Sequence, residues 1–339
     1  MTGPSSAHSL GIAILGCGRI AGHHARAIAA LPELGRVLVA ADADPARAAA
    51  LAQAQGIPET ARDLDAILAR RDVDAVLVCT PNALHAAQSI RILESGRHVL
   101  VEKPFAETAA DAERMAETAA RTGRVLALGQ TLRHTAPIRW LQDHARDFGR
   151  LRAVEVSMRV RWDGPQAPWW KTRSRREGLI LSLYAPHALD FVQLVLGVDA
   201  VHVHAEVARW QSGWDSEDEA MILLRYPGGV LAQVHISYNQ RYLVDRKTVH
   251  FDDAMLRVEN GEWLWQDGRC VVEPADATAG DPHRMGGRDL GHYFRTQFRE
   301  FVAAVRGEPH RSVLHEEGLR LTRLLDRVID SGLRNAPQL

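Results

Sequence analysis

Short runs of apolar residues alternate with longer amphipathic stretches over the first 130 residues of the chain. The apolar runs, each of strand length, read GIAILG, RVLVAAD, AVLVC, HVLVEK and RVLALG. The stretches between them have helical length and spacing and cover Ile20–Leu31, Pro45–Gln55, Leu84–Ser95 and Ala109–Arg121. Strands that are apolar throughout are covered on both faces, and strands that alternate with helices form parallel sheets. The pattern predicts an α/β fold with a doubly wound parallel sheet of the Rossmann type.

The pattern changes after Gln130, where period-two alternation replaces the continuous apolar runs. A helical segment over Pro137–Arg146 precedes alternating segments that read LRAVEVSMRV, HVHAEV, AMILLRY and VLAQVHISY. Further helices are expected over Gly178–Leu196, Tyr293–Val305 and Glu316–Ile329. Alternation of this kind is typical of strands with one buried face. We therefore expect a flexible tail over residues 1–10, a Rossmann domain over 11–130, and a second domain with a largely antiparallel sheet over 131–339.

Composition and charge narrow the class of protein. Lysine plus arginine number 41 and aspartate plus glutamate 42, so no excess of positive charge favours a nucleic-acid partner. The longest apolar stretch, over 178–201, contains Pro186, Asp190 and Gln193, which argues against a membrane span. The first ten residues lack the basic and apolar regions of a signal peptide, and the chain's three cysteines, Cys17, Cys79 and Cys270, suit reduced thiols. These features predict a cytoplasmic protein.

The 16 histidines do not form a recognisable metal site. His23 and His24 are adjacent on the first predicted helix, and His202 and His204 alternate along a predicted strand. Metal sites need converging sets of histidine, cysteine or carboxylate ligands, and no such set accompanies either pair in the sequence. We predict no catalytic metal.

The segment GCGRIA, Gly16 to Ala21, lies where the first strand ends and the first helix begins. It fits the G-x-G-x-x-G/A pattern of dinucleotide-binding domains in the required context. Gly16 permits a tight turn, Gly18 lets the backbone approach a pyrophosphate, and Ala21 allows close packing of helix on strand. Arg19 and Ile20 carry the backbone amides that face the phosphates at the helix amino terminus.

Asp42 ends the second predicted strand, 21 residues beyond Ala21. An acid there accepts hydrogen bonds from the adenosine ribose hydroxyls and repels a 2'-phosphate, so it favours NAD over NADP. The alternative is that Asp42 and Asp44 only cap the next helix; Asp44 fits that cap better because Pro45 follows it directly.

Two segments give the chain a family resemblance: CTPNALHAAQSIRILESGRHVLVEKPFAET, from Cys79 to Thr108, and GLILSLYAPHALDFVQLVLG, from Gly178 to Gly197. They resemble the glucose-fructose oxidoreductase/inositol dehydrogenase (Gfo/Idh/MocA) family, whose motifs are T-P-N-x-x-H, E-K-P and D-x-G-x-H-x-x-D. The resemblance implies a Rossmann domain followed by an α/β domain with an open sheet. It also implies substrate binding between the domains and a homodimer or homotetramer built through the sheet faces.

Matched to these motifs, Thr80, Asn82 and His85 belong to the cofactor loop, where Asn82 and His85 shape the loop rather than perform chemistry. The resemblance places Glu102 and Lys103 at the cofactor, with Lys103 near the nicotinamide and a cis peptide before Pro104. It makes His187 the catalytic histidine and Asp190 its following acid. Lys103 and His187 are thus the expected catalytic residues and substrate contacts.

The chain departs from the family pattern at Leu183, which replaces the first aspartate of the helix motif, and at Ala185, which replaces its glycine. In a continuous helix, residues 183 and 187 share a face, so a carboxylate at 183 could orient the histidine, whereas leucine cannot. Tyr184 lies three residues before His187 and carries a hydroxyl that could substitute as a catalytic group.

Three tryptophans, Trp162, Trp169 and Trp170, precede the basic residues Lys171, Arg173, Arg175 and Arg176. Indole faces stack on sugars, which makes Trp162 and Trp170 candidate substrate contacts. Arginine forks bind phosphate or carboxylate groups. A solvated loop or a subunit contact explains the same cluster.

Together these features predict an NAD-dependent oxidoreductase that transfers a hydride between nicotinamide and a secondary alcohol or ketone of a sugar, cyclitol or related polyol. One alternative is an enzyme that uses transient oxidation by bound NAD to break a glycosidic bond. The other, favoured by Leu183, is a dinucleotide-binding regulator without turnover.

Overall fold

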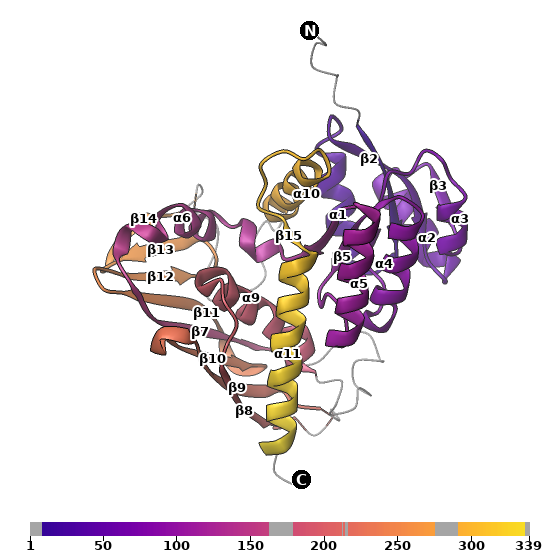
Figure 1. Ribbon diagram of the computed structural model, residues 1–339. Helices are drawn as coiled ribbons and strands as arrows, with labels where there is room; N and C mark the ends of the chain where they lie inside the picture. The colour runs from indigo at the N-terminus through magenta and orange to yellow at the C-terminus, as the bar shows by residue number, and fades with distance from the viewer. Residues whose placement is uncertain (1–8, 163–178, 212, 214–215, 275–290, 336–339) are drawn as a thin grey trace. The chain divides into compact units, whose positions relative to one another are not determined.

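The computed structural model describes residues 9–162, 179–211, 213, 216–274 and 291–335 (Figure 1). These residues form two compact units. Unit 1 takes the described residues up to 131 and those within 289–322, and unit 2 takes those within 132–288 and from 323 onward. Each unit is described by itself below.

Unit 1 is built on a seven-stranded sheet with the order β15-β6-β5-β4-β1-β2-β3. Strands β1 to β6 run parallel, and β15 pairs antiparallel with β6. The strands are β1 (Leu10–Leu15), β2 (Gly35–Ala41), β3 (Glu59–Ala61), β4 (Ala75–Val78), β5 (His98–Glu102), β6 (Leu126–Gly129) and β15 (Val313–Leu314). The order 3-2-1-4-5-6 is that of a Rossmann sheet, which confirms the predicted fold class for this half of the chain.

Three helices of unit 1 begin after a residue whose side chain accepts a hydrogen bond from a free backbone N–H group of the first turn. Asp44 accepts a hydrogen bond from Ala46 N at 3.0 Å, so the capping role predicted for Asp44 is confirmed. Thr108 caps the fifth helix in the same way through Asp111 N at 3.1 Å. The helices are α1 (Arg19–Ala29), α2 (Pro45–Gln55), α3 (Leu64–Leu68), α4 (His85–Glu94), α5 (Ala109–Thr122) and α10 (Gly291–Val305), with a 3-10 turn at Asn82–Leu84.

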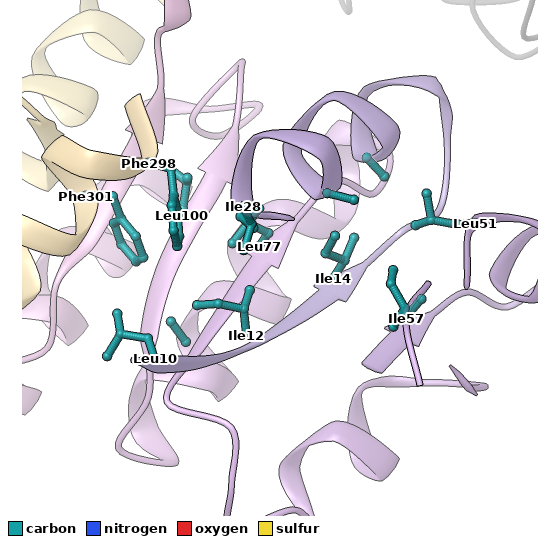
Figure 2. Packing of buried hydrophobic residues seen from close by; sticks show 14 of the residues in the cluster. Leu10, Ile12, Ile14, Ile28, Leu51, Ile57, Leu77, Leu100, Phe298 and Phe301 are labelled. Atoms are coloured by element: carbon teal, nitrogen blue, oxygen red, sulfur yellow. The ribbon is translucent and has the colours of Figure 1, made fainter. Parts of the chain in front are cut away.

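The core of unit 1 includes α10, which is distant from the other core elements in the sequence. Figure 2 shows Phe298 and Phe301 beside Leu10 and Leu100. Gly35 of β2 makes room for this packing, because an added Cβ would lie 2.7 Å from the Phe298 ring. The predicted division at residue 131 therefore differs from the structure: the segment within 289–322 belongs with the Rossmann sheet, since it supplies core phenylalanines and an edge strand.

Unit 2 contains an eight-stranded sheet with the order β14-β13-β12-β11-β7-β10-β9-β8. Its neighbouring strands pair antiparallel except for β10 and β7, which confirms the largely antiparallel sheet. The strands are β7 (Leu151–Arg161), β8 (His202–Ala208), β9 (Glu219–Arg225), β10 (Leu231–Ser237), β11 (Asn239–Phe251), β12 (Met255–Glu259), β13 (Trp263–Gln266) and β14 (Arg269–Val272).

The helix expected over Gly178–Leu196 is two helices, α8 (Ile180–Leu183) and α9 (Ala185–Leu196). Tyr184 lies between them, with a φ of -114°. Pro186 explains the break, because proline lacks an N–H and its ring crowds the carbonyl four residues earlier. The other helices are α6 (Ala136–His144) and α11 (His315–Asn335), with 3-10 turns at Thr131–His134, Ala145–Phe148 and Pro227–Gly229; the unit boundary falls within α11. Among the described residues, none of the helices combines the length and apolarity needed to cross a bilayer.

Candidate functional site

The glycine-rich turn after β1 uses its two glycines for different purposes. Gly16 has a φ of +92°, and an added Cβ would lie 2.6 Å from the Cys79 carbonyl, so only glycine fits this turn. Gly18 has ordinary backbone angles, and an added Cβ would meet no described atom within 4 Å. The turn thus needs Gly16 for its own fold, whereas Gly18 leaves open space for a ligand to approach the backbone.

The amino end of α1 fits a phosphate group. Arg19 and Ile20 open the helix, Ala21 packs against the core, and within the described residues no side chain caps the free N–H groups. The first turn also lacks an acidic residue that would compete for them. Helix amino ends in this condition attract anions through these N–H groups and the helix dipole. The residues present therefore fit a dinucleotide pyrophosphate.

Asp42 follows β2, and its carboxylate lies against the glycine-rich turn. One oxygen accepts a hydrogen bond from Cys17 N at 2.7 Å and the other from Asp44 N at 2.9 Å. The two aspartates therefore have separate roles, because Asp44 caps α2 while Asp42 faces the turn. Each carboxylate oxygen of Asp42 keeps a lone pair for a further donor.

The turn after β4 is tied to the turn after β5 by a buried histidine. His85 begins α4, and its ring nitrogens lie 2.8 Å from Pro104 O and 3.0 Å from Thr80 O. Burial lowers the pKa of His85, and the two carbonyl oxygens oppose that effect. The Thr80 hydroxyl donates to Gln88 at 2.6 Å. These bonds support the predicted structural role of His85, which holds the two turns together.

Asn82 lies in the 3-10 turn between β4 and α4 and is 6% exposed. Its amide nitrogen is buried and has no hydrogen-bond partner among the described residues. A buried donor without an acceptor is costly, so this nitrogen is suited to an acceptor group of a ligand. This is a second feature of the structure that fits the implied cofactor.

Lys103 follows β5 and is joined to Pro104 by a cis peptide bond, as predicted. Burial lowers the pKa of Lys103, an effect opposed by the Glu102 carboxylate and reinforced by Arg19. A lysine with a lowered pKa exchanges protons more readily near neutral pH than an exposed one. The Lys103 amine is thus suited to proton transfer at the carboxyl end of the sheet, where ligands bind in this fold class.

Glu102 forms a buried pair that the sequence patterns did not predict. Its Oε1 lies 2.8 Å from His24 Nε2 of α1, and its Oε2 accepts the Lys103 N–H at 3.2 Å. Burial raises the pKa of Glu102, but the hydrogen bond from His24 and nearby positive charge bring it below its ordinary value. Helical spacing offered a signal, because His24 shares the buried face of α1 with Ala21 and Ile28.

In unit 2, the carboxylate of Asp190 in α9 forms an ion pair with Arg133. Two guanidinium nitrogens donate to the two carboxylate oxygens, each at 2.8 Å, and each side chain is 5% exposed. His187 is partly exposed near the start of the same helix, and its backbone N–H donates to the Tyr184 carbonyl oxygen at 3.2 Å. The bidentate pair fixes the buried side of α9.

The amino end of α8 is held by Glu217, a buried acid with no motif to mark it. Its carboxylate accepts hydrogen bonds from Leu179 N at 2.8 Å and Leu181 N at 3.1 Å, and from the Ser216 hydroxyl. Burial raises the pKa of Glu217, and these donors oppose the effect. The acid therefore positions the short helix that ends at Leu183.

Tyr184 and Trp162, two of the predicted site residues, meet at Tyr238. The Tyr184 ring centroid lies 5.5 Å from that of Tyr238, and the Trp162 centroid lies 4.7 Å from it. Tyr238 is 4% exposed, so this cluster is a packed one. No sequence motif marked Tyr238. Trp169, Trp170 and the basic residues after them lie outside the described residues.

Metal binding has no support in the part of the chain that the structure describes, which holds no group of three or more histidine, cysteine or carboxylate side chains placed to bind an ion.

Two family models match the chain. The model described as "Oxidoreductase family, NAD-binding Rossmann fold" matches residues 10–130, and that of the GFO/IDH/MocA C-terminal domain matches residues 144–257. An inositol 2-dehydrogenase from Rhizobium meliloti (strain 1021) is 30% identical over 334 residues, covering 94% of this chain and 95% of the relative. A 1,5-anhydro-D-fructose reductase from Ensifer adhaerens is 28% identical over 84% of this chain and 85% of its own.

Solved structures share the fold over nearly the whole chain. Levoglucosan dehydrogenase in complex with NADH and levoglucosan aligns with a TM-score of 0.85 at 21% identity, covering 97% of this chain and 98% of that one. A structure described as a putative myo-inositol dehydrogenase from Sinorhizobium meliloti 1021 gives a TM-score of 0.81 at 24% identity, covering 96% and 98%. At these identities the likeness establishes the fold.

Proposed function

The chain belongs to the GFO/IDH/MocA oxidoreductase family, and from this premise we propose that it is an NAD-dependent dehydrogenase or reductase acting on a sugar, cyclitol or related polyol. The reacting group would be a secondary alcohol or the corresponding ketone. The observation that carries the proposal is Lys103, a partly buried lysine directly after β5, in the same unit as the glycine-rich turn and with its pKa lowered by burial. The names of the relatives, which include an inositol dehydrogenase and a sugar reductase, support the substrate class.

Lys103 would act as the proton acceptor when the substrate is oxidised and as the donor in the reverse direction. The bound nicotinamide supplies the hydride chemistry. Oxidation of an alcohol also releases a proton, which the neutral lysine amine can take. Because burial lowers the pKa of Lys103, its neutral form is populated at a lower pH than that of an exposed lysine. Oxidation should therefore become faster as the pH rises, and the midpoint of this rise in the pH–rate profile should lie below the ordinary pKa of lysine.

His187 would contact the substrate and share proton transfer, without the carboxylate that the family motif places four residues earlier. Leu183 stands at that position, and Asp190 is already engaged by Arg133. Tyr184, the predicted substitute, packs its ring beside that of Tyr238. Lys103 is therefore the stronger of the two catalytic assignments.

We further propose that NAD(H) is preferred over NADP(H), because Asp42 lies where the adenosine ribose binds in this fold and would repel a 2'-phosphate. Titration of both reduced cofactors by tryptophan fluorescence tests this. NADH should bind at least about tenfold more tightly, a difference of about 1.4 kcal/mol. Asp42→Ala should narrow the difference. Equal or tighter binding of NADPH by the unaltered protein would reject the role given to Asp42.

The substrate class is tested by incubating the protein and NAD with a panel of sugars and cyclitols over neutral to alkaline pH. Formation of NADH with at least one polyol supports the proposal. One competing function is a regulator that binds dinucleotide without turnover. The presence of Leu183 in place of the motif aspartate supports it. That competitor predicts tight NADH binding and no NADH formation with the whole panel. The cytoplasmic location and the homo-oligomeric state stay predictions.

A further inference from the structure

The buried pair of His24 and Glu102 connects two parts of unit 1, the first helix and the end of β5. The proposed reaction needs these two parts in a fixed relative position. His24 belongs to α1, whose amino end fits the pyrophosphate, and Glu102 is the last residue of β5, directly before Lys103. The side chains are 4% and 10% exposed, and the atoms His24 Nε2 and Glu102 Oε1 lie 2.8 Å apart. The pair therefore joins the dinucleotide-binding helix to the strand that carries the amine.

Both members of the pair are confined by their surroundings. The His24 ring meets the Phe294 ring edge to face, with centroids 4.9 Å apart. On the other side, Gly129 of β6 leaves room for the carboxylate, because an added Cβ would lie 3.1 Å from Glu102 Oε1. With Oε1 directed at His24, Oε2 is the oxygen that receives the Lys103 N–H. The orientation of the carboxylate thus determines where the main chain at Lys103 is held.

We propose that His24 is a positioning residue for Lys103, acting through the Glu102 carboxylate. A buried carboxylate that loses a hydrogen-bond donor must find another or become neutral, since burial without a partner is costly. The Lys103 amine belongs to the next residue, and its charge and that of Glu102 affect each other. Without His24, the carboxylate turns toward that amine and draws it from its working position. The expected loss of turnover rests on the proposed function, whereas the displacement of the Lys103 amine does not.

Three variants of α1 separate this role from simple packing. His24→Leu removes the donor and keeps an apolar side chain against Phe294. His24→Gln keeps a side-chain N–H near the position of Nε2. His23→Leu is the matched control, because the His23 ring also stacks on Phe294, with centroids 5.3 Å apart, but its Nδ1 is bonded to Arg26 rather than to a carboxylate.

The first readout does not depend on turnover. The chain has three lysines, Lys103, Lys171 and Lys247, so ¹³Cε-lysine labelling gives an NMR spectrum that Lys103→Ala assigns directly. In the NADH-loaded protein the Lys103 signal should shift in His24→Leu, return toward its original position in His24→Gln and stay in place in His23→Leu. If His24→Leu does not fold, His24→Asn replaces it, because the shorter amide places its N–H away from the carboxylate.

The second readout is kinetic. His24→Leu should lower kcat by about tenfold or more, and His24→Gln should recover most of it, while the Kd for NADH stays within about twofold. The inference would be overturned if His24→Leu and His23→Leu changed the Lys103 signal and kcat equally. It would also be overturned if His24→Gln had no higher kcat than His24→Leu. If the signal moves as expected but the unaltered protein oxidises no polyol, the positioning role stands and the proposed function fails.

Discussion

Each compact unit buries a carboxylate near a candidate catalytic side chain, but the two carboxylates have different partners. Glu102 adjoins Lys103 and shares one short hydrogen bond with His24. Asp190 lies one helical turn beyond His187 and receives two hydrogen bonds from Arg133. Arginine keeps its charge at every working pH and binds a carboxylate through two parallel N–H groups. The acid in unit 2 is therefore fixed through both oxygens as a structural anion, whereas the acid in unit 1 is held to its partner side chain through one oxygen.

The largest effect should come from breaking the pair in unit 2. Arg133→Met leaves the Asp190 carboxylate buried without its cation, which should lower the free energy of unfolding by about 3–5 kcal/mol. The control is Arg121→Met, which removes an ion pair to Glu94 whose side chains are 62% and 48% exposed, and should cost less than about 1 kcal/mol. Denaturant titration measures both.

The double variant Arg133→Met with Asp190→Leu sharpens this test. Replacing both charges by apolar side chains removes the unpaired anion, so most of the lost stability should return. An Arg133→Met variant no less stable than Arg121→Met would show that the pair is not a structural anchor and that Asp190 is open to a catalytic role.

Lys103→Ala should have the next largest effect and should act on turnover rather than on binding. Loss of a positioned proton-transfer group lowers kcat by roughly a hundredfold or more, while the affinity for NADH changes little. Steady-state kinetics and fluorescence titration measure the two quantities. A Lys103→Ala enzyme with near-normal turnover would place the proton transfer elsewhere.

His187→Ala is the corresponding variant in unit 2, and it should lower kcat by roughly a hundredfold. Thermal unfolding is measured alongside. If turnover stays near normal while the protein unfolds more easily, His187 is a packing residue and the chemistry is confined to Lys103.

The two glycines of the turn after β1 should separate folding from binding. Gly16→Ala forces a Cβ into the Cys79 carbonyl and strains the backbone, so it should lower stability by about 1–3 kcal/mol. Gly18→Ala should leave the melting temperature unchanged but weaken NADH binding by about tenfold, because its side chain enters the space expected for the pyrophosphate. Unchanged NADH affinity in Gly18→Ala would contradict that placement.

The smallest effect is expected at Leu183, where an added carboxylate would make unit 2 resemble the family pattern. Leu183→Asp introduces a negative charge four residues before His187, across the break at Tyr184, and a carboxylate that reaches the imidazole favours its protonated form. If His187 is a base in the reaction, the acidic limb of the pH–rate profile should move upward by about one unit. An unmoved limb in a folded, NADH-binding variant would exclude His187 as the titrating base. Leu183→Asn is the uncharged control.

Local patterns in the sequence predicted the α/β class, the Rossmann strands and the glycine-rich turn, and the family resemblance implied the cis peptide before Pro104. These features depend on neighbouring residues: apolar runs define strands, Gly16 suits a positive φ, and Pro45 places Asp44 at a helix cap. The family motifs also placed Lys103 at the end of a strand. Such features need no knowledge of which distant segments meet.

Tertiary structure alone decided which distant groups became partners. His24 and Glu102 are 78 positions apart, and Arg133 and Asp190 are 57 apart, so no periodicity connects them. The same holds for Phe298, which fills the space over Gly35 and draws a late helix into the first unit. A buried charge must be neutralised by whichever group the fold brings within hydrogen-bond distance. The sequence therefore determined the residue types of the site, and the packing of the strands and helices determined which of them are held together.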